Sequence, residues 1–136
     1  MIDCKPKYID RVFKRSDCPI PLLGDDIARF LKNCESVLVF AVTLGEDFDR
    51  QLRKAQLVSM SSAIMLDSQA GKCLDEFLDS KVGKRRFSPG YGDFPLSVNR
   101  DIIEVLKAST KIGLCVTDEY ILTPQKSITG VMAVDS

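Results

Sequence analysis

The chain has 136 residues, a length that fits one domain burying about two-thirds of the surface that its unfolded form exposes. Its 19 basic residues balance 19 acidic ones, and this zero net charge argues against nonspecific binding to nucleic acid or to an anionic membrane. The sequence contains no histidine, which excludes Ser-His-Asp and Cys-His nucleophiles, histidine general bases and most catalytic metal sites.

The beginning of the chain and its cysteines indicate a cytoplasmic protein. Residues 1–7 are charged and lack the apolar core of a signal peptide, and no apolar run reaches the length of a membrane span. The 5 cysteines contain no Cys-x-x-Cys pair, so we expect reduced, mostly buried thiols and no zinc site. Cys115 lies in an apolar run, which predicts a position in the core.

The first part of the chain is expected to form an irregular segment, residues 1–23, of a single domain that spans residues 1–136. Within it, residues 8–13 fit either a short strand or a helical turn. A helix is predicted over residues 25–33, because two acids in its first turn complement the helix dipole. Residues 36–43 form a continuous apolar and β-branched run, which predicts a buried strand.

Two helices are predicted next, over residues 46–58 and roughly 60–80. The second is expected to be the central packed helix, because apolar residues recur along one broad face: Ile64, Leu66, Ala70, Cys73, Leu74, Phe77 and Leu78. Its acidic residues are expected mainly to form a solvated face. The strand–Gly45–helix step does not predict a nucleotide-binding loop, because that fingerprint requires several glycines at fixed spacing.

The last third of the chain is predicted to contain one helix and three strands. Ser97 is a candidate N-cap for a helix that continues to about residue 107. Strands are expected at residues 111–117, 121–123 and 127–134, and their short links favour antiparallel hairpins. The order of elements predicts an α+β fold, a mainly antiparallel sheet covered by helices.

Between these elements lies a segment, residues 85–97, that is rich in proline, glycine and aromatic residues. Ser88 to Tyr91 is predicted to form a type II turn, with Pro89 at the first corner and Gly90 in the positive φ region at the second. Such a turn fixes the directions of Arg86 and Tyr91, a guanidinium and an aromatic ring suited to a polar ligand with a flat base. The same residues also fit a rigid surface loop whose aromatic side chains complete the core.

The run Arg86-Phe87-Ser88-Pro89-Gly90-Tyr91 matches an Arg-x-x-x-Gly-Tyr motif. The segment resembles the S-adenosylmethionine-binding motif in the activation (reactivation) domain of cobalamin-dependent methionine synthase. Residues 42–45 with Asp49, and residues 123–130, resemble two further segments of that domain. Residues 92–96 are similar to its short, free-standing members, so the resemblance implies an activation-domain-like fold.

The resemblance also implies roles for the residues of the turn. Arg86 would pair with the ligand carboxylate, and Tyr91 would offer its hydroxyl to a polar group or its ring to the adenine or sulfonium. The backbone of Phe87 and Ser88 would contact adenine or ribose, with Gly90 shaping the turn. We therefore expect Arg86 and Tyr91 to point into one shared hollow.

Residues outside the turn would complete the ligand site. Asp75 or Glu76, on the preceding helix, would bind the ligand ammonium, and Asp93 is a weaker alternative. Met132 stands where the larger synthases carry an aromatic residue, which removes a hydroxyl donor and lowers the expected affinity. No residue is expected to perform acid–base catalysis.

The activity implied by the resemblance is reductive methylation during methionine biosynthesis. The chain would be a component of a methyltransferase that presents S-adenosylmethionine to cob(II)alamin, carried by the cobalamin-binding module of methionine synthase or by another corrinoid protein. An electron donor such as a flavodoxin would supply the electron. Two alternatives remain: an adaptor that contacts a corrinoid protein without methyl transfer, and a small-molecule sensor that uses the same pocket.

Overall fold

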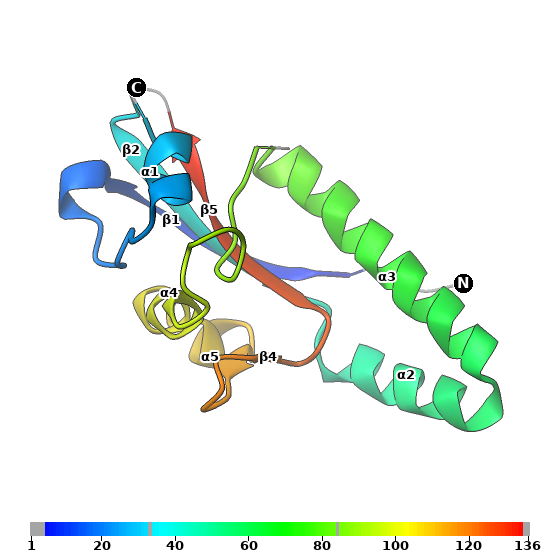
Figure 1. Ribbon diagram of the computed structural model, residues 1–136. Coiled ribbons are helices and arrows are strands. Elements are labelled where there is room, and N and C mark those ends of the chain that lie inside the picture. The colour runs from blue at the N-terminus through cyan, green and yellow to red at the C-terminus, as the bar shows by residue number, and fades with distance from the viewer. Residues whose placement is uncertain (1–4, 33, 84, 135–136) are drawn as a thin grey trace.

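The computed structural model describes residues 5–32, 34–83 and 85–134, which form a small antiparallel sheet with helices on both faces (Figure 1). Helix α3 (Met60–Lys81) lies against one face, while α1 (Asp25–Phe30) and α4 (Val98–Leu106) lie against the other. The predicted α+β fold with an antiparallel sheet and covering helices is confirmed.

The sheet has the order β1-β2-β5, and both pairs of strands are antiparallel. The central strand β2 (Ser36–Thr43) pairs along its whole length with β1 (Lys7–Lys14) and with β5 (Ser127–Val134). Because helices cover both of its faces, β2 carries apolar side chains at successive positions instead of alternating ones.

The prediction of an irregular N-terminal segment is wrong for much of residues 1–23. Residues 7–14 form β1, and a 3-10 helix, η1 (Arg15–Asp17), follows. The strand was hard to recognise because it lies at the edge of the sheet, where half-exposed charged residues such as Asp10 interrupt the apolar pattern. Residues 1–4 lie outside the described part of the chain.

Each face of the sheet has its own apolar core. On the α1 and α4 face, Val39 and Val131 pack with Ile27, Leu31 and residues of α4. The second core lies under the C-terminal half of α3, and it contains Phe40, Val42, Leu74, Leu78 and Val82. Helix α1 ends at Phe30, three residues before the predicted end.

The N-terminal half of α3 does not lie over the sheet. It forms a helical hairpin with α2 (Glu46–Val58), which extends away from the sheet (Figure 1). Phe48 and Leu52 of α2 pack there against Ala63 and Ala70 of α3. Ile64, predicted to belong to the buried face, is 63% exposed, so α3 is central to the core only in its second half.

The C-terminal elements differ from the prediction in two places. Residues 108–111 form a short helix, α5 (Ala108–Lys111), and the predicted strand is reduced to β3 (Cys115–Val116). Strand β3 pairs with β4 (Leu122–Thr123) in the expected antiparallel manner, but β5 joins the main sheet beside β2. Ser97 occupies the predicted N-cap position of α4, but it has helical φ and ψ and its side chain makes no capping bond.

The cysteines also depart from the expectation. Cys115, the first residue of β3, is exposed, whereas Cys34 is buried. Cys18, Cys34 and Cys115 are free thiols, while Cys73 is disulfide-bonded and is therefore not the reduced thiol that was predicted. Cys4 lies outside the described residues. Among the described helices, none is long and apolar enough to cross a membrane.

Candidate functional site

The predicted turn in the Arg86–Tyr91 segment is present. The Tyr91 N–H donates to the Ser88 carbonyl over 3.1 Å, and Gly90 has a φ of 90°, as a type II turn requires at its third residue. The Gly90 N–H donates onward to the Phe94 carbonyl over 2.8 Å. These bonds hold the segment in a defined shape on the surface.

Phe87 attaches this segment to the open edge of β5. Its N–H donates to the Val131 carbonyl over 2.9 Å and its carbonyl accepts from the Val131 N–H over 2.8 Å. The expectation that the Phe87 backbone is free for a ligand is therefore wrong, because the sheet edge uses both groups. Gly130 permits this approach, since a Cβ there would lie 2.8 Å from the Phe87 carbonyl oxygen and 2.8 Å from the Phe40 ring.

Arg86 points to the α3 face of the sheet. Its guanidinium donates to Asp79 over 2.7 Å, to the Gly83 carbonyl over 2.9 Å and to Asp75 over 3.3 Å, and the side chain is only 15% exposed. Asp79 was not predicted as a site residue. Its sequence signal is the spacing of four from Asp75, which places both carboxylates on the same side of the helix.

Tyr91 lies on the other side of the segment. Its ring packs edge-to-face on the Phe87 ring, with centroids 5.3 Å apart, and Phe87 belongs to the core under α1 and α4. The residue is 70% exposed, so its outer ring face and hydroxyl meet solvent. The prediction of one shared hollow is therefore wrong: Arg86 and Tyr91 have partners on opposite faces of the sheet.

The remaining predicted residues divide between the two sides. Asp75 contacts Arg86, whereas Glu76 is exposed and has no described contact with it. Met132 packs in the core under α3, and a Cβ on Gly83 would lie 3.6 Å from its sulfur, so Met132 borders the Arg86 cluster from below. Ser88 is half-buried, and its carbonyl is used by the turn.

Asp93 has a structural role that the sequence did not reveal. Its carboxylate accepts the N–H groups of Asp25 over 2.7 Å and of Asp26 over 3.0 Å, which caps the N-terminus of α1. The backbone N–H bonds, first of Asp26 and then of Asp25, lower the pKa of the Asp93 carboxyl. Because Gly24 at the N-cap has no side chain, this distant carboxylate supplies the cap instead.

The cluster of Arg86, Asp75 and Asp79 has one cation and two anions, with an exposed carboxylate edge on Asp75. A group that carries both signs of charge, such as the α-carboxylate and α-ammonium of an amino acid, is complementary to this arrangement. Among the described residues, no group of three or more histidine, cysteine, aspartate or glutamate side chains fits a metal ion.

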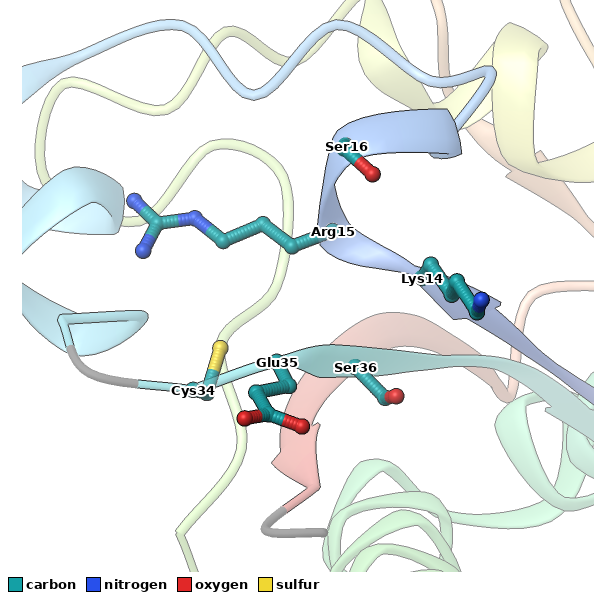
Figure 2. Close-up of a pocket in the computed structure, with 6 residues that line it drawn as sticks. All are labelled: Lys14, Arg15, Ser16, Cys34, Glu35 and Ser36. Atoms are coloured by element: carbon teal, nitrogen blue, oxygen red, sulfur yellow. The ribbon is translucent and has the colours of Figure 1, made fainter.

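Two cavities lie elsewhere. One of about 650 Å³ lies between the end of β1 and the start of β2, where Figure 2 shows Arg15 directed away from Lys14 and the Cys34 sulfur directed toward the gap. Arg15 donates there to the Leu31 carbonyl over 2.8 Å, so its guanidinium already helps to end α1. The other, of about 730 Å³, lies at the N-terminus of α2, beside Gly45 and Gly113.

A search of solved structures finds a similar one, the crystal structure of the MetH reactivation domain bound to AdoHcy, with a TM-score of 0.60 and 21% sequence identity. The match covers 71% of this chain and 38% of that chain, so this chain spans well under half the length of the structure that it matches. No protein-family model matches the chain, and no curated protein matches it. The chain therefore has the fold of the MetH reactivation domain over most of its described length.

Proposed function

We propose that the chain binds S-adenosylmethionine along the Arg86–Tyr91 segment and reactivates a cobalamin-dependent methyltransferase carried on another polypeptide. The observation that carries this proposal is the fold, which is shared with a reactivation domain solved with AdoHcy, the demethylated form of S-adenosylmethionine. The Arg-x-x-x-Gly-Tyr turn, at an open sheet edge of that fold, adds a specific place for the ligand.

The amino-acid end of the ligand fits the α3 side of the segment. Arg86 would bind the α-carboxylate through its planar fork of donors, and the exposed Asp75 would accept the α-ammonium. To bind the ligand carboxylate, Arg86 must release part of its contact with Asp75. This 3.3 Å bond is longer than the 2.7 Å bond from Arg86 to Asp79, so it is the weaker of the two. The 2.7 Å bond to Asp79 keeps the guanidinium in place meanwhile.

The other end of the ligand fits the exposed ring of Tyr91. Because Arg86 and Tyr91 lie on opposite sides of the segment, the ligand would bind in an extended form across the sheet edge rather than within a closed pocket. The turn bond between Ser88 and Tyr91 fixes the ring position before binding, which lowers the entropic cost of binding. An open site of this kind leaves the sulfonium methyl group accessible to a second protein.

The transfer that follows needs no proton donor. The partner's cobalamin, once reduced from cob(II)alamin by one electron from a flavodoxin-type donor, would supply the nucleophile for the methyl carbon, while Arg86 and Tyr91 would hold the methyl donor in place. The carbon–sulfur bond breaks with its electron pair going to sulfur, which leaves neutral AdoHcy. The chain contributes orientation and proximity, worth about 7–11 kcal/mol in ideal cases, in agreement with a sequence that lacks histidine.

Calorimetric titration with S-adenosylmethionine tests the first step. We expect Arg86→Ala to abolish the binding heat. The matched control is Arg85→Ala, at the exposed neighbouring residue, which should retain the binding heat of the wild type. Since Arg86 also contacts α3, Tyr91→Ala is a second variant. It removes the ring contact with Phe87 but none of the hydrogen bonds or ion pairs of Arg86, and it should weaken binding at least tenfold.

The second step is tested with a cobalamin-loaded methionine synthase that lacks its own reactivation domain, a reductant and a methyl-labelled donor. Label is expected on the cobalt only when the chain is present. A chain that binds S-adenosylmethionine but transfers no methyl group would be a sensor, and a chain that binds none would be an adaptor at most. Either result would overturn the proposal.

A further inference from the structure

The end of the α2–α3 hairpin exposes apolar side chains that the fold leaves uncovered. We define the hairpin tip as five residues that are each 63% exposed or more: Leu57, Val58, Met60, Ile64 and Met65. Single exposed apolar residues are ordinary, but several large ones gathered over nine consecutive positions mark an interaction surface. The tip is the end of the hairpin that extends away from the sheet (Figure 1).

We propose that the hairpin tip, together with the α3 flank that leads from it to Arg86, docks onto the cobalamin-carrying protein that this chain serves. The inference rests on the proposed function and deepens it by naming the surface that holds the partner. The partner surface should offer apolar side chains to the tip and carboxylates to the basic residues of α2 just before it.

Ile64 is aligned with the Arg86 cluster along α3. Ile64 and Asp75 are eleven residues apart on α3, three helical turns, so they lie on the same side of the helix about 16 Å apart. Ser68, exposed, and Gly71, half-buried, lie between them on that side. Asp75 in turn contacts Arg86, so one flank of α3 joins the apolar tip to the candidate ligand site.

The size of an ordinary protein interface connects the tip with the candidate ligand site. A standard protein–protein interface covers about 800 Å² on each partner, a patch roughly 30 Å across. An interface of that width that has the Arg86 cluster at one side therefore reaches Ile64, about 16 Å from Asp75 along α3. The tip lies at the rim of the same interface and not at a separate site.

The charge next to the tip distinguishes an acidic partner protein from a second copy of this chain. Arg53 and Lys54 are exposed on α2 just before the tip, and within the described part of the chain neither has an ion-pair partner. Two such tips would repel one another, which disfavours a second copy of this chain. An acidic protein surface satisfies these cations, and the methionines at the tip adapt readily to its shape.

The experiment compares two isoleucines of similar exposure. Ile64 is 63% exposed on the tip and Ile121 is 59% exposed at the β3–β4 turn, so Ile64→Ser and Ile121→Ser lose the same side chain at different places. Affinity for a cobalamin-loaded methionine synthase lacking its own reactivation domain is measured by interferometry. We expect Ile64→Ser to weaken this affinity about tenfold. The double variant with Leu57→Ser and Ile64→Ser should weaken it further, whereas Ile121→Ser should leave it unchanged.

A charge variant adds a second measurement. Arg53→Glu with Lys54→Glu should slow association and reduce its dependence on salt, while leaving the dissociation rate nearly unchanged. Equal affinity of all variants, or no binding by the wild-type chain, would overturn the docking surface. The docking surface would also be overturned if the tip residues instead mediated a dimer, seen in sedimentation, or binding to phosphatidylserine vesicles.

Calorimetry with S-adenosylmethionine on the same variants separates this inference from the proposed function. The tip is distant from Arg86, so Ile64→Ser should bind the ligand as the wild type does. If no variant and no wild-type chain binds the ligand, the proposed function fails. If all of them bind it while the tip variants keep full affinity for the synthase, only the docking surface fails.

Discussion

Asp26 and Asp93, which are 67 residues apart, each accept a backbone N–H from the other. The Asp26 N–H donates to the Asp93 carboxylate over 3.0 Å, and the Asp93 N–H donates to the Asp26 carboxylate over 3.2 Å. This reciprocal pair joins the first turn of α1 to the segment that follows the Arg86–Tyr91 turn. The candidate ligand segment is therefore fixed at both sides, by Phe87 on β5 and by Asp93 on α1.

Replacing Asp93 tests this connection. Asp93→Ala removes the acceptor for two N–H groups of α1, which have no intrahelical partner, so we expect a lower midpoint of urea denaturation. Asp93→Asn keeps an acceptor oxygen and should lose less. Asp118→Asn is the control, because Asp118 is fully exposed and makes only a 3.8 Å ion pair with Arg100.

The Asp93 bonds also predict how stability depends on pH. Because the folded state lowers the pKa of Asp93 below its ordinary value of 3.8, its contribution is present above that value and is lost as the pH falls through the folded-state pKa. The difference in unfolding free energy between wild type and Asp93→Asn should therefore be largest at neutral pH. A difference that stays constant down to about pH 2 would contradict the assignment.

The cap formed by Asp93 shows what sequence patterns alone leave out. Strand β2 and helix α2 were predicted with their observed bounds, because a continuous apolar run and an acidic first turn are local signals. For β1 the sequence left a short strand and a helical turn as alternatives over residues 8–13, because its pairing with β2 is set by tertiary contact. The Asp93 cap spans most of the chain, and no local pattern marks it.

Gly130→Ala tests the attachment of the ligand segment to β5. A Cβ at Gly130 meets the Phe40 ring and the Phe87 carbonyl, each at 2.8 Å, and neither group is the flexible end of a side chain. We expect a loss of about 1–3 kcal/mol in the free energy of unfolding. Weaker binding of S-adenosylmethionine should accompany it, because the Phe87 bridge positions Arg86.

Gly71→Ala is the matched substitution with the opposite expected sign. Gly71 lies inside α3, and a Cβ there meets only the end of the Lys126 side chain, at 3.5 Å or more. Alanine favours a helix interior over glycine by about 1 kcal/mol, so the variant should be more stable by up to that amount. A destabilised Gly71→Ala variant would show that this flank of α3 is packed more tightly than the structure indicates.

Tyr91→Phe separates the two roles that the Tyr91 side chain can have toward a ligand. The ring packs on Phe87 without help from its hydroxyl, so the free energy of unfolding should change by less than about 0.5 kcal/mol. Ligand affinity close to that of the wild type would indicate contact through the ring face. A loss similar to that of Tyr91→Ala would indicate a hydrogen bond from the hydroxyl.

The Arg86 site was also predictable only in part, because the turn depends on local residues whereas its side-chain contacts depend on tertiary packing. Pro89 and Gly90 specify a type II turn whatever surrounds them, so the turn itself followed from sequence. The sides to which Arg86 and Tyr91 point did not, because the Phe87 bridge to Val131 sets them. Asp79 was missed because its contact with Arg86 depends on where α3 crosses the sheet.

Thiol labelling tests the corrected placement of the cysteines. Cys115 is exposed, Cys18 is half-buried and Cys34 is 7% exposed, so a maleimide should modify them in that order. Burial raises the pKa of the Cys18 thiol, only partly opposed by the Ile20 N–H, so less reactive thiolate is present near neutral pH. Cys73, being disulfide-bonded, should react only after reduction. Peptide mass spectrometry at successive times gives the order directly. Early labelling of Cys34 would show that the chain just before β2 opens, since the Cys34 thiol is otherwise covered by the core under α1 and α4.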